Sequence, residues 1–556
     1  MSIPEWLHER LERLGDDQRV AATAAPGPVL CVAPAGSGKT TTLVARIGWR
    51  IANGDDAAQM CAVTFNRRAA DELRERVDAA LAPAGIVPGT VRVRTFHGLG
   101  LEILAEAGLP VDNIVERAVV LQELAGGALP VRALRFLEDA FSRLALDPER
   151  GPPPEDAQTH AAWYAYRAAL ADRNALDLDD LVARPGPTLR ADAALLGRWR
   201  CRTQILFVDE AQDLDRTQLD LALLLTGERR DIFLVGDDDQ TIYAWRLADV
   251  RRVLGLAALL PGLRRVGLVV NHRCPPEVVR RAARLVAHGR ERFDKRILPS
   301  PCASGTLTLA ADPGDAVARA RHLLGTWQRD GATGLAVLAR TNAELAPYAA
   351  IALEMEQPYQ VDEDGLLLDD PVIDGLLARA MAEAREGESP LLTLGRVLGA
   401  DGADPPPTAD AHPTATGTFA GGATGAPKLS TGMAGASLLS WAAAYATLEE
   451  LCSAIGAARR TRARLRAASD GIVLATVHGT KGLEFDHVAV IGLDDGVFPS
   501  RRSLDEAPDP ERALEEERRL AYVAWTRPRR SLTLLYDPAA PSVFLREAFS
   551  DAELRA

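Results

Sequence analysis

The segment from Val29 to Ile47, VLCVAPAGSGKTTTLVARI, places a lysine and hydroxyl side chains at a helix start that follows a glycine-rich turn. Such a turn directs several backbone N–H groups at one point, where the helix dipole also favours an anion. Gly36 and Gly38 let the backbone come close, and the ammonium of Lys39 can reach β- and γ-phosphates. The hydroxyl of Thr40 can bind Mg²⁺. The segment therefore predicts a site for a nucleoside triphosphate.

Lysine is rare in this chain, which has four lysines and 60 arginines, so each lysine is informative. Two of the four, Lys39 and Lys481, lie in glycine-flanked loops. A compact ammonium suits β- and γ-phosphates better than the planar fork of arginine. The strict phosphate-binding pattern begins with glycine, whereas Ala33 stands there, so a chance turn is the alternative interpretation. The apolar strand before the turn and the helix after it favour the phosphate site.

Two adjacent carboxylates follow another apolar segment, ILFVDEAQD, from Ile205 to Asp213. Asp209 can hold Mg²⁺, and Glu210 can orient or deprotonate an attacking water. The alternative is an acidic helix N-cap, because acids favour that position in any helix. Both carboxylates directly follow a buried strand, which is the position that this mechanism of triphosphate hydrolysis needs. We therefore predict that these two residues complete the nucleotide site.

Apolar segments of strand length alternate with helical patterns, which predicts an α/β fold with parallel, doubly wound sheets. Residues 103–197 lack strong strand signals and are expected to be mainly helical. A second set of strands begins with GLAVLART and resumes with IVLATVHG and HVAVIGLD. Residues 401–437, rich in Gly, Ala, Pro and Thr, cannot bury a core and are predicted to be a disordered linker. The first set of strands is PVLCVA, MCAVTF, VRVRTF, TQILFVDE and DIFLVGD.

Length and charge limit the possibilities further. A chain of 556 residues is too long for one core and suggests three or four domains. Its net charge of −13 excludes DNA binding through a generally basic surface, so any nucleic-acid contact must be a local groove. No apolar run approaches the roughly 18 residues of a membrane span, and the six scattered cysteines form no CxxC pair. We expect a cytoplasmic protein with reduced thiols, no membrane contact and no zinc or iron–sulfur site.

The segment LVGDDDQTIYAWRLADV, Leu234 to Val250, completes a set of motifs that resembles one family, the UvrD/Rep group of superfamily 1 DNA helicases. The resemblance covers nearly the whole chain, with the motifs in the family's order. It implies an ATP-dependent DNA helicase that moves 3′ to 5′ on single-stranded DNA, with ATP and Mg²⁺ between two RecA-like lobes. The other motifs are GDDQRVAA, APAGSGKT, AVTFNRRAADELRERV, VRTFHGLG, LDLDDL, ILFVDEAQD, VVNHRCP, TVHGTKGLEFDHVAVIG and EEERRLAYVAWTRPR.

The resemblance also implies how the chain is divided. The larger relatives carry a sizeable helical subdomain inside the second lobe, and its reduction here leaves contact with duplex DNA open. The implied parts are 1–102 and 198–274 for the first lobe, 103–197 for its helical insertion, 275–380 and 470–556 for the second lobe, and 381–469 for the reduced insertion.

Roles in the nucleotide site follow from the same resemblance. Gln18 would read the adenine edge, Gln240 would sense the γ-phosphate, and Glu484 would bind the ribose. Arg273 and Arg527 would be arginine fingers, which are worth about 10³–10⁵ in rate elsewhere. The other implied nucleotide contacts are Ala35, Gly36, Ser37, Gly38, Lys39, Thr40, Thr41 and His272.

Two of these positions depart from the family pattern. His272 stands where the family usually has a tyrosine that stacks on adenine, and imidazole stacks less well. Thr41 stands where an arginine is common, which removes another nucleotide contact. We therefore expect looser selectivity for the base of ATP.

Non-specific binding of single-stranded DNA needs aromatic faces for stacking and cations for phosphates. The resemblance places Phe65 and Trp245 against bases, and it implies single-stranded DNA and its junctions with duplex as partners. Core packing is the alternative for any single aromatic residue, and it stays open for Phe96 in particular. The full predicted set is Phe65, Phe96, His97, Tyr243, Trp245, Arg246, His478 and Lys481.

Three functions remain open from the sequence. The first is a stand-alone helicase in DNA repair, replication restart or recombination. The second is a translocase that unwinds weakly alone and serves as the motor of a larger nuclease or anti-phage assembly. The third is a P-loop ATPase or nucleotide-gated binding module without motor function, whose turnover would be indifferent to DNA. The motifs TFHG, AWR and HGTKGLEF argue against the third.

Overall fold

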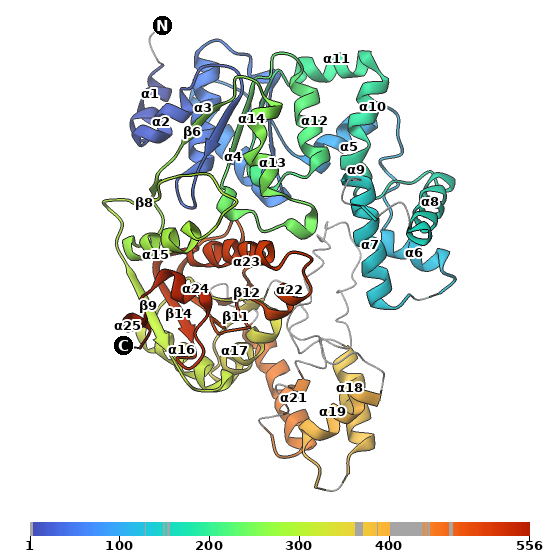
Figure 1. Ribbon diagram of the computed structural model, residues 1–556, viewed down its shortest axis with the longest axis vertical. Helices are drawn as coiled ribbons and strands as arrows, with labels where there is room; N and C mark the ends of the chain where they lie inside the picture. The colour runs from blue at the N-terminus through green and yellow to red at the C-terminus, as the bar shows by residue number, and fades with distance from the viewer. Residues whose placement is uncertain are drawn as a thin grey trace. The chain divides into compact units, whose positions relative to one another are not determined.

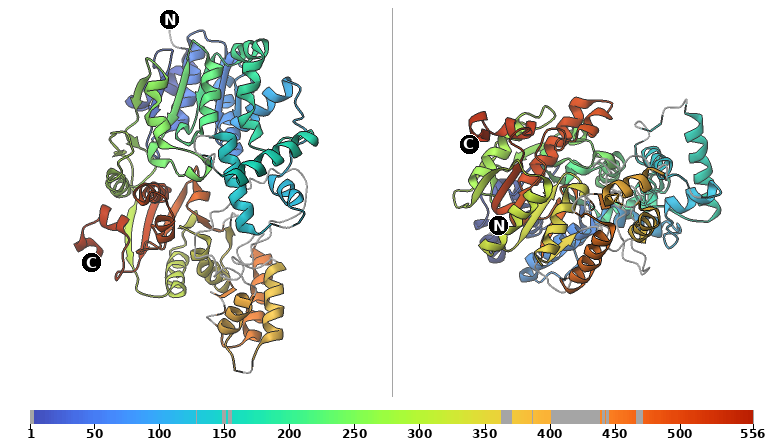
Figure 2. Two further views of the ribbon diagram at one scale, coloured as in Figure 1. Left: turned by 45° about the vertical axis from the view of Figure 1, so that its right-hand side comes forward. Right: turned by 90° about the horizontal axis from the view of Figure 1, so that it is seen from below.

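The computed structural model describes residues 4–127, 129–147, 151–152, 156–361, 371–385, 387–400, 438–439, 442, 445–465 and 471–555. They form two compact units, the first Met1–Asn271 with Glu291–Ile297 and the second His272–Arg290 with Leu298–Ala556. Each unit contains a six-stranded parallel sheet flanked by helices (Figures 1 and 2). This confirms the predicted α/β class with two RecA-like lobes. The predicted linker 401–437 lies outside the described residues, and the finer division into four parts stays a prediction.

The sheet of the first unit has the strand order β3-β2-β4-β5-β1-β6. All five strands predicted for the first set are present. The sixth, β6, was not predicted because its sequence, RRVG, is polar and pairs only with β1 at the sheet edge. The bounds are β1 Val29–Val32, β2 Met60–Thr64, β3 Arg92–Thr95, β4 Ile205–Val208, β5 Ile232–Gly236 and β6 Arg264–Gly267.

Both faces of this sheet are covered by helices, which explains why its central strands are apolar throughout. Side chains alternate along a strand. Leu30 and Val32 of β1 accordingly pack in one cluster, with residues of α5 and α12, and Val29 and Cys31 pack in the opposite cluster, with residues of α3 and α4. The bounds are α1 Glu5–Glu12, α2 Asp16–Ala22, α3 Lys39–Ala52, α4 Arg67–Leu81, α5 Phe96–Glu106, α12 Arg216–Thr226, α13 Val250–Leu254 and α14 Leu256–Leu259.

The described residues between β3 and β4 are mainly helical and add no strand to the sheet, in agreement with the mainly helical insertion predicted there. Three of these helices share a small core that includes Val120, Phe141 and Tyr166. The bounds are α6 Arg117–Leu124, α7 Val131–Leu146, α8 Ala157–Asp172, α9 Asp180–Ala183, α10 Pro185–Ala191 and α11 Ala193–Arg202.

The sheet of the second unit has the order β11-β12-β10-β13-β14-β9. Helix α17 packs on this sheet and also shares a core with α18, α19 and α21. Helices α19 and α21 lie within the predicted second insertion, residues 381–469, whereas most of α18 precedes it. The strands are β9 Thr306–Ala311, β10 Leu335–Ala339, β11 Tyr359–Val361, β12 Ile472–Thr476, β13 Phe485–Val490 and β14 Pro528–Tyr536. The helices are α15 Pro276–Ala287, α16 Ala316–Asp330, α17 Asn342–Glu354, α18 Pro371–Glu383, α19 Pro390–Ala400, α21 Leu448–Leu465, α22 Arg501–Asp505, α23 Pro510–Trp525, α24 Val543–Ala548 and α25 Asp551–Arg555.

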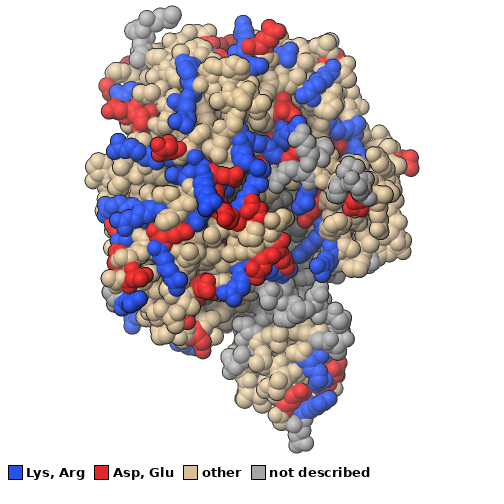
Figure 3. Space-filling model, in the orientation of Figure 1, with Lys and Arg blue, Asp and Glu red and all other residues tan. Residues whose placement is uncertain are grey.

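Within the described ranges, no helix combines the length and apolar character that crossing a bilayer requires. All six cysteines are free thiols. On the face drawn in Figure 3, Lys and Arg side chains are interspersed with Asp and Glu side chains. That face is therefore not uniformly basic.

Candidate nucleotide and nucleic-acid site

The carboxyl ends of β1, β4 and β5 meet at one edge of the first sheet, which is where parallel α/β sheets bind ligands. Strand β1 leads into the glycine-rich turn, β4 into Asp209, and β5 into Asp237. Strand pairing extends to the first residues of these loops, since the N–H of Ala33 donates to the carbonyl of Gly236 at 2.8 Å. The three nucleotide-site segments predicted for the first unit therefore lie together in space.

The conformation of the phosphate-binding loop depends on its glycines and on two side-chain amides. Gly38 has φ +81°, and a Cβ there would come within 2.4 Å of Nε2 of Gln18. That amide donates to the carbonyl of Ser37 at 2.8 Å, and Nδ2 of Asn271 donates to the carbonyl of Ala35 at 2.9 Å. Gln18 thus lies against the phosphate-binding loop, within the predicted nucleotide site. Its contact with adenine stays a prediction. The sequence reasoning missed Asn271.

Lys39, the first residue of α3, acts electrostatically on two buried carboxylates. Burial and the charge of Glu210 raise the pKa of Asp209 to about 7, and the ammonium of Lys39 opposes that rise. Burial also disfavours the charge of Asp237, but Lys295 and then Lys39 hold the pKa of Asp237 below its ordinary value. The ammonium of Lys39 therefore favours the charged form of both carboxylates.

The oxygen donors of the predicted nucleotide site fit Mg²⁺. Magnesium in triphosphate sites is held by one or two carboxylates together with waters and phosphate oxygens. Thr40 and Asp209 offer one hydroxyl and one buried carboxylate. In the part of the chain that the structure describes, no group of three or more His, Cys, Asp or Glu side chains could hold a metal alone. One hydroxyl and one carboxylate are the partial ligand set that Mg²⁺ takes in triphosphate sites.

Glu210 is held by its neighbours in an unusual backbone conformation. Its φ is +52°, and its N–H donates to Oδ1 of Asp209 at 3.0 Å. Nε2 of Gln212 donates to its carboxylate at 2.7 Å, and Oε1 of Gln212 accepts from the N–H of Asp237 at 3.0 Å. Gln212 therefore ties the β4 carboxylate to the loop after β5, a link that the sequence motif alone does not reveal.

An aromatic pair lies at the same edge of the sheet, beyond the nucleotide residues. Phe65 follows β2, and Tyr243 follows the short helix η5 (Asp238–Gln240). Their rings stack with centroids 4.9 Å apart and planes 11° apart, and the guanidinium carbon of Arg246 lies 5.7 Å from the centroid of the Phe65 ring. Flat rings next to a cation are what non-specific binding of single-stranded nucleic acid needs.

Two other residues of the first unit were predicted to contact DNA, His97 and Trp245. Burial and then the charge of Arg246 lower the pKa of His97, with Asp179 opposing, so His97 is neutral near pH 7 and can contribute hydrogen bonding or stacking but no charge. Trp245 lies in the short helix η6 (Ala244–Arg246), and its side chain is outside the described residues. Its predicted contact with a base stays a prediction.

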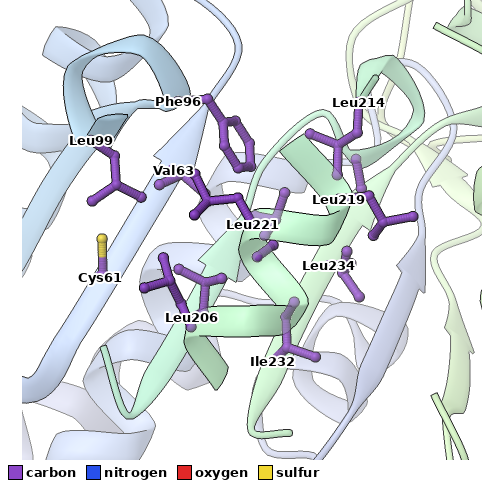
Figure 4. Close-up of a cluster of buried hydrophobic side chains, with 14 of the residues drawn as sticks. Cys61, Val63, Phe96, Leu99, Leu206, Leu214, Leu219, Leu221, Ile232 and Leu234 are labelled. Carbon is purple, nitrogen blue, oxygen red and sulfur yellow. The ribbon is translucent and has the colours of Figure 1, made fainter. Parts of the chain in front are cut away.

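The predicted DNA contact of Phe96 is wrong. Its ring is 2% exposed and packs in the hydrophobic core with Val63, Leu99 and Leu206 (Figure 4). The reason is that Phe96 is the first residue of α5, capped by Thr95, and α5 covers one face of the sheet. Core packing, the alternative left open by the sequence, is the correct interpretation.

We expect Phe96→Ala to lower the thermal stability of the protein, because truncating a buried Phe costs about 3–5 kcal/mol. Phe96→Leu should have a much smaller effect, since it keeps most of the volume. The midpoint of thermal unfolding and the Kd for a fluorescent oligo(dT) should be measured for both. A loss of DNA affinity in Phe96→Leu without a change in the midpoint would contradict this assignment.

In the second unit, three predicted nucleotide residues lie near the starts of β13 and β14. Glu484 directly precedes β13, and Arg527 directly precedes β14. Nη2 of Arg273 lies 2.6 Å from Oε2 of Glu484, and its Nη1 donates to the carbonyl of Thr526 at 3.2 Å. Burial opposes the charge of Glu484, but Arg273 and Arg529 lower its pKa. Arg527 is 2% exposed, with Nε donating to the carbonyl of Val523 at 2.8 Å. Both guanidinium groups are thus engaged in bonds within the second unit.

The remaining predicted residues of the second unit lie on loops. His272 is exposed, directly before Arg273. His478 begins the short helix η7 (His478–Thr480) after β12, and Lys481 follows it. This loop follows the carboxyl end of its strand, as the Phe65 segment does in the first unit.

A parallel sheet with a glycine-rich phosphate loop at its carboxyl edge defines a P-loop nucleotide-binding protein. The chain matches the family model of the UvrD/REP helicase N-terminal domain over residues 14–149 and 133–259, and that of the UvrD-like helicase C-terminal domain over residues 442–538. The chain belongs to the UvrD/Rep helicase family. This confirms the predicted family and the enzyme class of ATP-dependent helicases.

Three relatives illustrate the similarity. ATP-dependent DNA helicase UvrD2 of Mycobacterium tuberculosis is 32% identical over 94% of this chain and 78% of its own length. DNA helicase II of Escherichia coli is 27% identical over 95% of this chain and 84% of its own length. ATP-dependent DNA helicase Rep of Escherichia coli is 26% identical over 94% of this chain and 90% of its own length.

Proposed function

We propose that this protein is an ATP-dependent DNA helicase that moves 3′ to 5′ on single-stranded DNA, in DNA repair, replication restart or recombination. The observation that supports this most is the edge of the first sheet. Lys39, Asp209 and Glu210 converge there, and the Phe65–Tyr243 pair lies on the same edge. The names of the relatives, which include DNA helicases, support a DNA track.

The mechanism assigns each group one task. Lys39 would bind the β- and γ-phosphates, and Glu210 would orient the attacking water. Thr40 and Asp209 would hold Mg²⁺, which would supply positive charge to the phosphates. Gln240 would sense the γ-phosphate, and Arg273 and Arg527 would supply positive charge to the triphosphate during hydrolysis. His272 would contact the base of ATP, and Glu484 would bind its ribose. His478 and Lys481 would bind the single-stranded DNA.

The direct test compares ATP turnover with and without single-stranded DNA and then measures unwinding. We expect DNA to stimulate turnover and a 3′-tailed duplex, but not a 5′-tailed one, to be opened. Turnover indifferent to DNA would support the ATPase without motor function instead. Stimulated turnover without unwinding by the purified chain would support the alternative of a translocase motor of a larger assembly.

Phe65→Ala should weaken binding of single-stranded DNA by about 1–3 kcal/mol, a Kd increase of roughly 5- to 150-fold, because one stacking face is lost. Phe136→Ala is the matched control, since Phe136 is an aromatic residue of α7 with 57% exposure. Measuring Kd against salt separates stacking from charge. The slope of the logarithm of the binding constant against the logarithm of the salt concentration should stay unchanged for Phe65→Ala. The magnitude of this slope should fall by about 0.7 for Arg246→Ala if that residue contacts one phosphate. A Kd unchanged in Phe65→Ala would remove this residue from the DNA site.

The preference of the enzyme for ATP over GTP should be weaker than if a tyrosine stood at position 272. The reason is that His272 is exposed and that imidazole stacks on a base less well than a phenol ring does. We expect kcat/KM for GTP within about tenfold of that for ATP, since a lost contact of about 1.4 kcal/mol is a factor of ten. His272→Tyr should raise the preference for ATP. Strict preference for ATP in the wild-type protein would contradict the expectation.

A further inference from the structure

Three consecutive aspartates follow β5 and are almost completely buried. The side chains of Asp237, Asp238 and Asp239 are 0%, 0% and 3% exposed. Buried carboxylates are costly unless they are paired with cations and hydrogen-bonded. The loop that carries the proposed γ-phosphate sensor Gln240 therefore depends on positive charge from elsewhere in the chain.

Lys295 provides most of that charge. Its Nζ lies 2.6 Å from Oδ1 of Asp237, 2.5 Å from Oδ1 of Asp238 and 3.0 Å from Oδ2 of Asp239, and its side chain is 5% exposed. Arg292 adds two hydrogen bonds to Asp239, at 2.8 and 2.9 Å. Lys295 is one of only four lysines. A compact ammonium can serve three carboxylates around one point, whereas the planar fork of arginine cannot.

The contacts of Asp237 extend this charge cluster into the nucleotide site. Its Oδ2 accepts a hydrogen bond from Nε2 of Gln240 at 2.6 Å. Its N–H donates to Gln212, which in turn donates to the carboxylate of Glu210. One hydrogen-bonded chain therefore runs from Lys295 to both groups that the mechanism assigns to the γ-phosphate and the attacking water.

The segment that carries Lys295 is attached to the first unit although its sequence neighbours are not. Residues Glu291–Ile297 belong to the first unit, while the chain on either side belongs to the second. The N–H of Phe293 donates to Asp238 at 2.7 Å, and its ring lies 5.2 Å below the guanidinium carbon of Arg265. These contacts fix Lys295 in place, so its ammonium is preorganised against the aspartates.

We propose that Lys295 is a positioning residue for ATP hydrolysis, which holds Asp237 so that Gln240 and, through Gln212, Glu210 keep the orientation that the reaction needs. This inference rests on the proposed function. Lys295 touches neither nucleotide nor water in this scheme, so its loss should lower kcat and leave the KM for ATP nearly unchanged.

The test uses the full chain and four variants. Lys295→Met removes the ammonium, and Lys295→Arg keeps the charge in a less suitable shape. Because Lys295→Met leaves buried carboxylates unpaired, the double variant Lys295→Met/Asp238→Asn restores the net charge of the cluster and protects folding. Arg296→Met is the matched control, since it removes a cation from the adjacent, exposed position. DNA-stimulated kcat, KM for ATP and the thermal midpoint are measured for each.

We expect kcat to fall by about ten- to a hundredfold in both Met variants at Lys295, as when a group that orients an active residue is lost. KM should change less than about threefold. Lys295→Arg should recover part of the loss, and Arg296→Met should match the wild type. A folded double variant with kcat within twofold of wild type, or an equal loss in Arg296→Met, overturns this inference alone. A wild-type chain without DNA-stimulated turnover overturns the proposed function and this inference with it.

Discussion

Lys39→Ala lowers DNA-stimulated ATP turnover by at least about 10²-fold, because removing one preorganised donor from a developing phosphate charge costs that much or more. Lys39 begins α3, directly after the left-handed Gly38, and its charge acts on both Asp209 and Asp237. Lys39→Arg should be almost as inactive, since the planar guanidinium cannot replace a compact charge in a loop that Gln18 and Asn271 also hold. Steady-state ATPase rates at saturating oligo(dT) measure both.

The control for Lys39 is Arg13→Ala, which removes a cation with 76% side-chain exposure from the residue that follows α1 in the same unit. It should retain wild-type turnover. Thermal unfolding of Lys39→Ala should show an intact fold, because the side chain is not part of the hydrophobic core. Near-normal DNA-stimulated turnover in Lys39→Ala would remove the nucleotide site from this loop.

Glu210→Gln should lower kcat by about 10²–10⁴, the usual contribution of a positioned general base, while ATP still binds. Glutamine has the same shape and can keep a hydrogen bond with Gln212, but it cannot accept a proton from water. Loss of the charge also relieves Asp209, whose pKa burial and Glu210 together raise to about 7. The variant should therefore unfold at a temperature no lower than that of the wild type.

Single-turnover ATPase and equilibrium binding of a fluorescent ATP analogue separate these two effects. Glu228→Gln is the control, because Glu228 is an exposed carboxylate on the loop after α12. A Glu210→Gln protein that hydrolyses ATP at the wild-type rate would show that another group orients the water.

The sequence predicted the central strands and the loops after them for a physical reason. Strands β1, β2, β4 and β5 are buried on both faces, so they appear as unbroken apolar segments, and the side chains at their carboxyl ends necessarily share an edge. Lys39 and Asp209 were therefore predictable in type and in place. The edge strand β6 was not, because pairing with one neighbour requires little apolar surface.

Two kinds of residue escaped prediction. The first is the aromatic residue whose environment depends on tertiary packing, as Phe96 shows. Phe65 and Phe96 both directly follow strands, yet Phe65 stacks on Tyr243, whereas Phe96, the first residue of α5, packs in the hydrophobic core. The second is the long-range partner. Lys295 lies more than fifty residues from the aspartates that it pairs with, and only the scarcity of lysine marked it in the sequence.

The stacked Tyr243 stands three positions beyond Gln240 in the same stretch of backbone. Under the proposed function, nucleotide and strand each restrict that stretch, so their affinities are thermodynamically linked. Such linkage is reciprocal: whatever factor a bound strand applies to the dissociation constant of a non-hydrolysable nucleotide, that nucleotide applies to the dissociation constant of the strand. Titrating each ligand in the presence of the other yields that common factor, which gives the coupling free energy between the nucleotide and the strand.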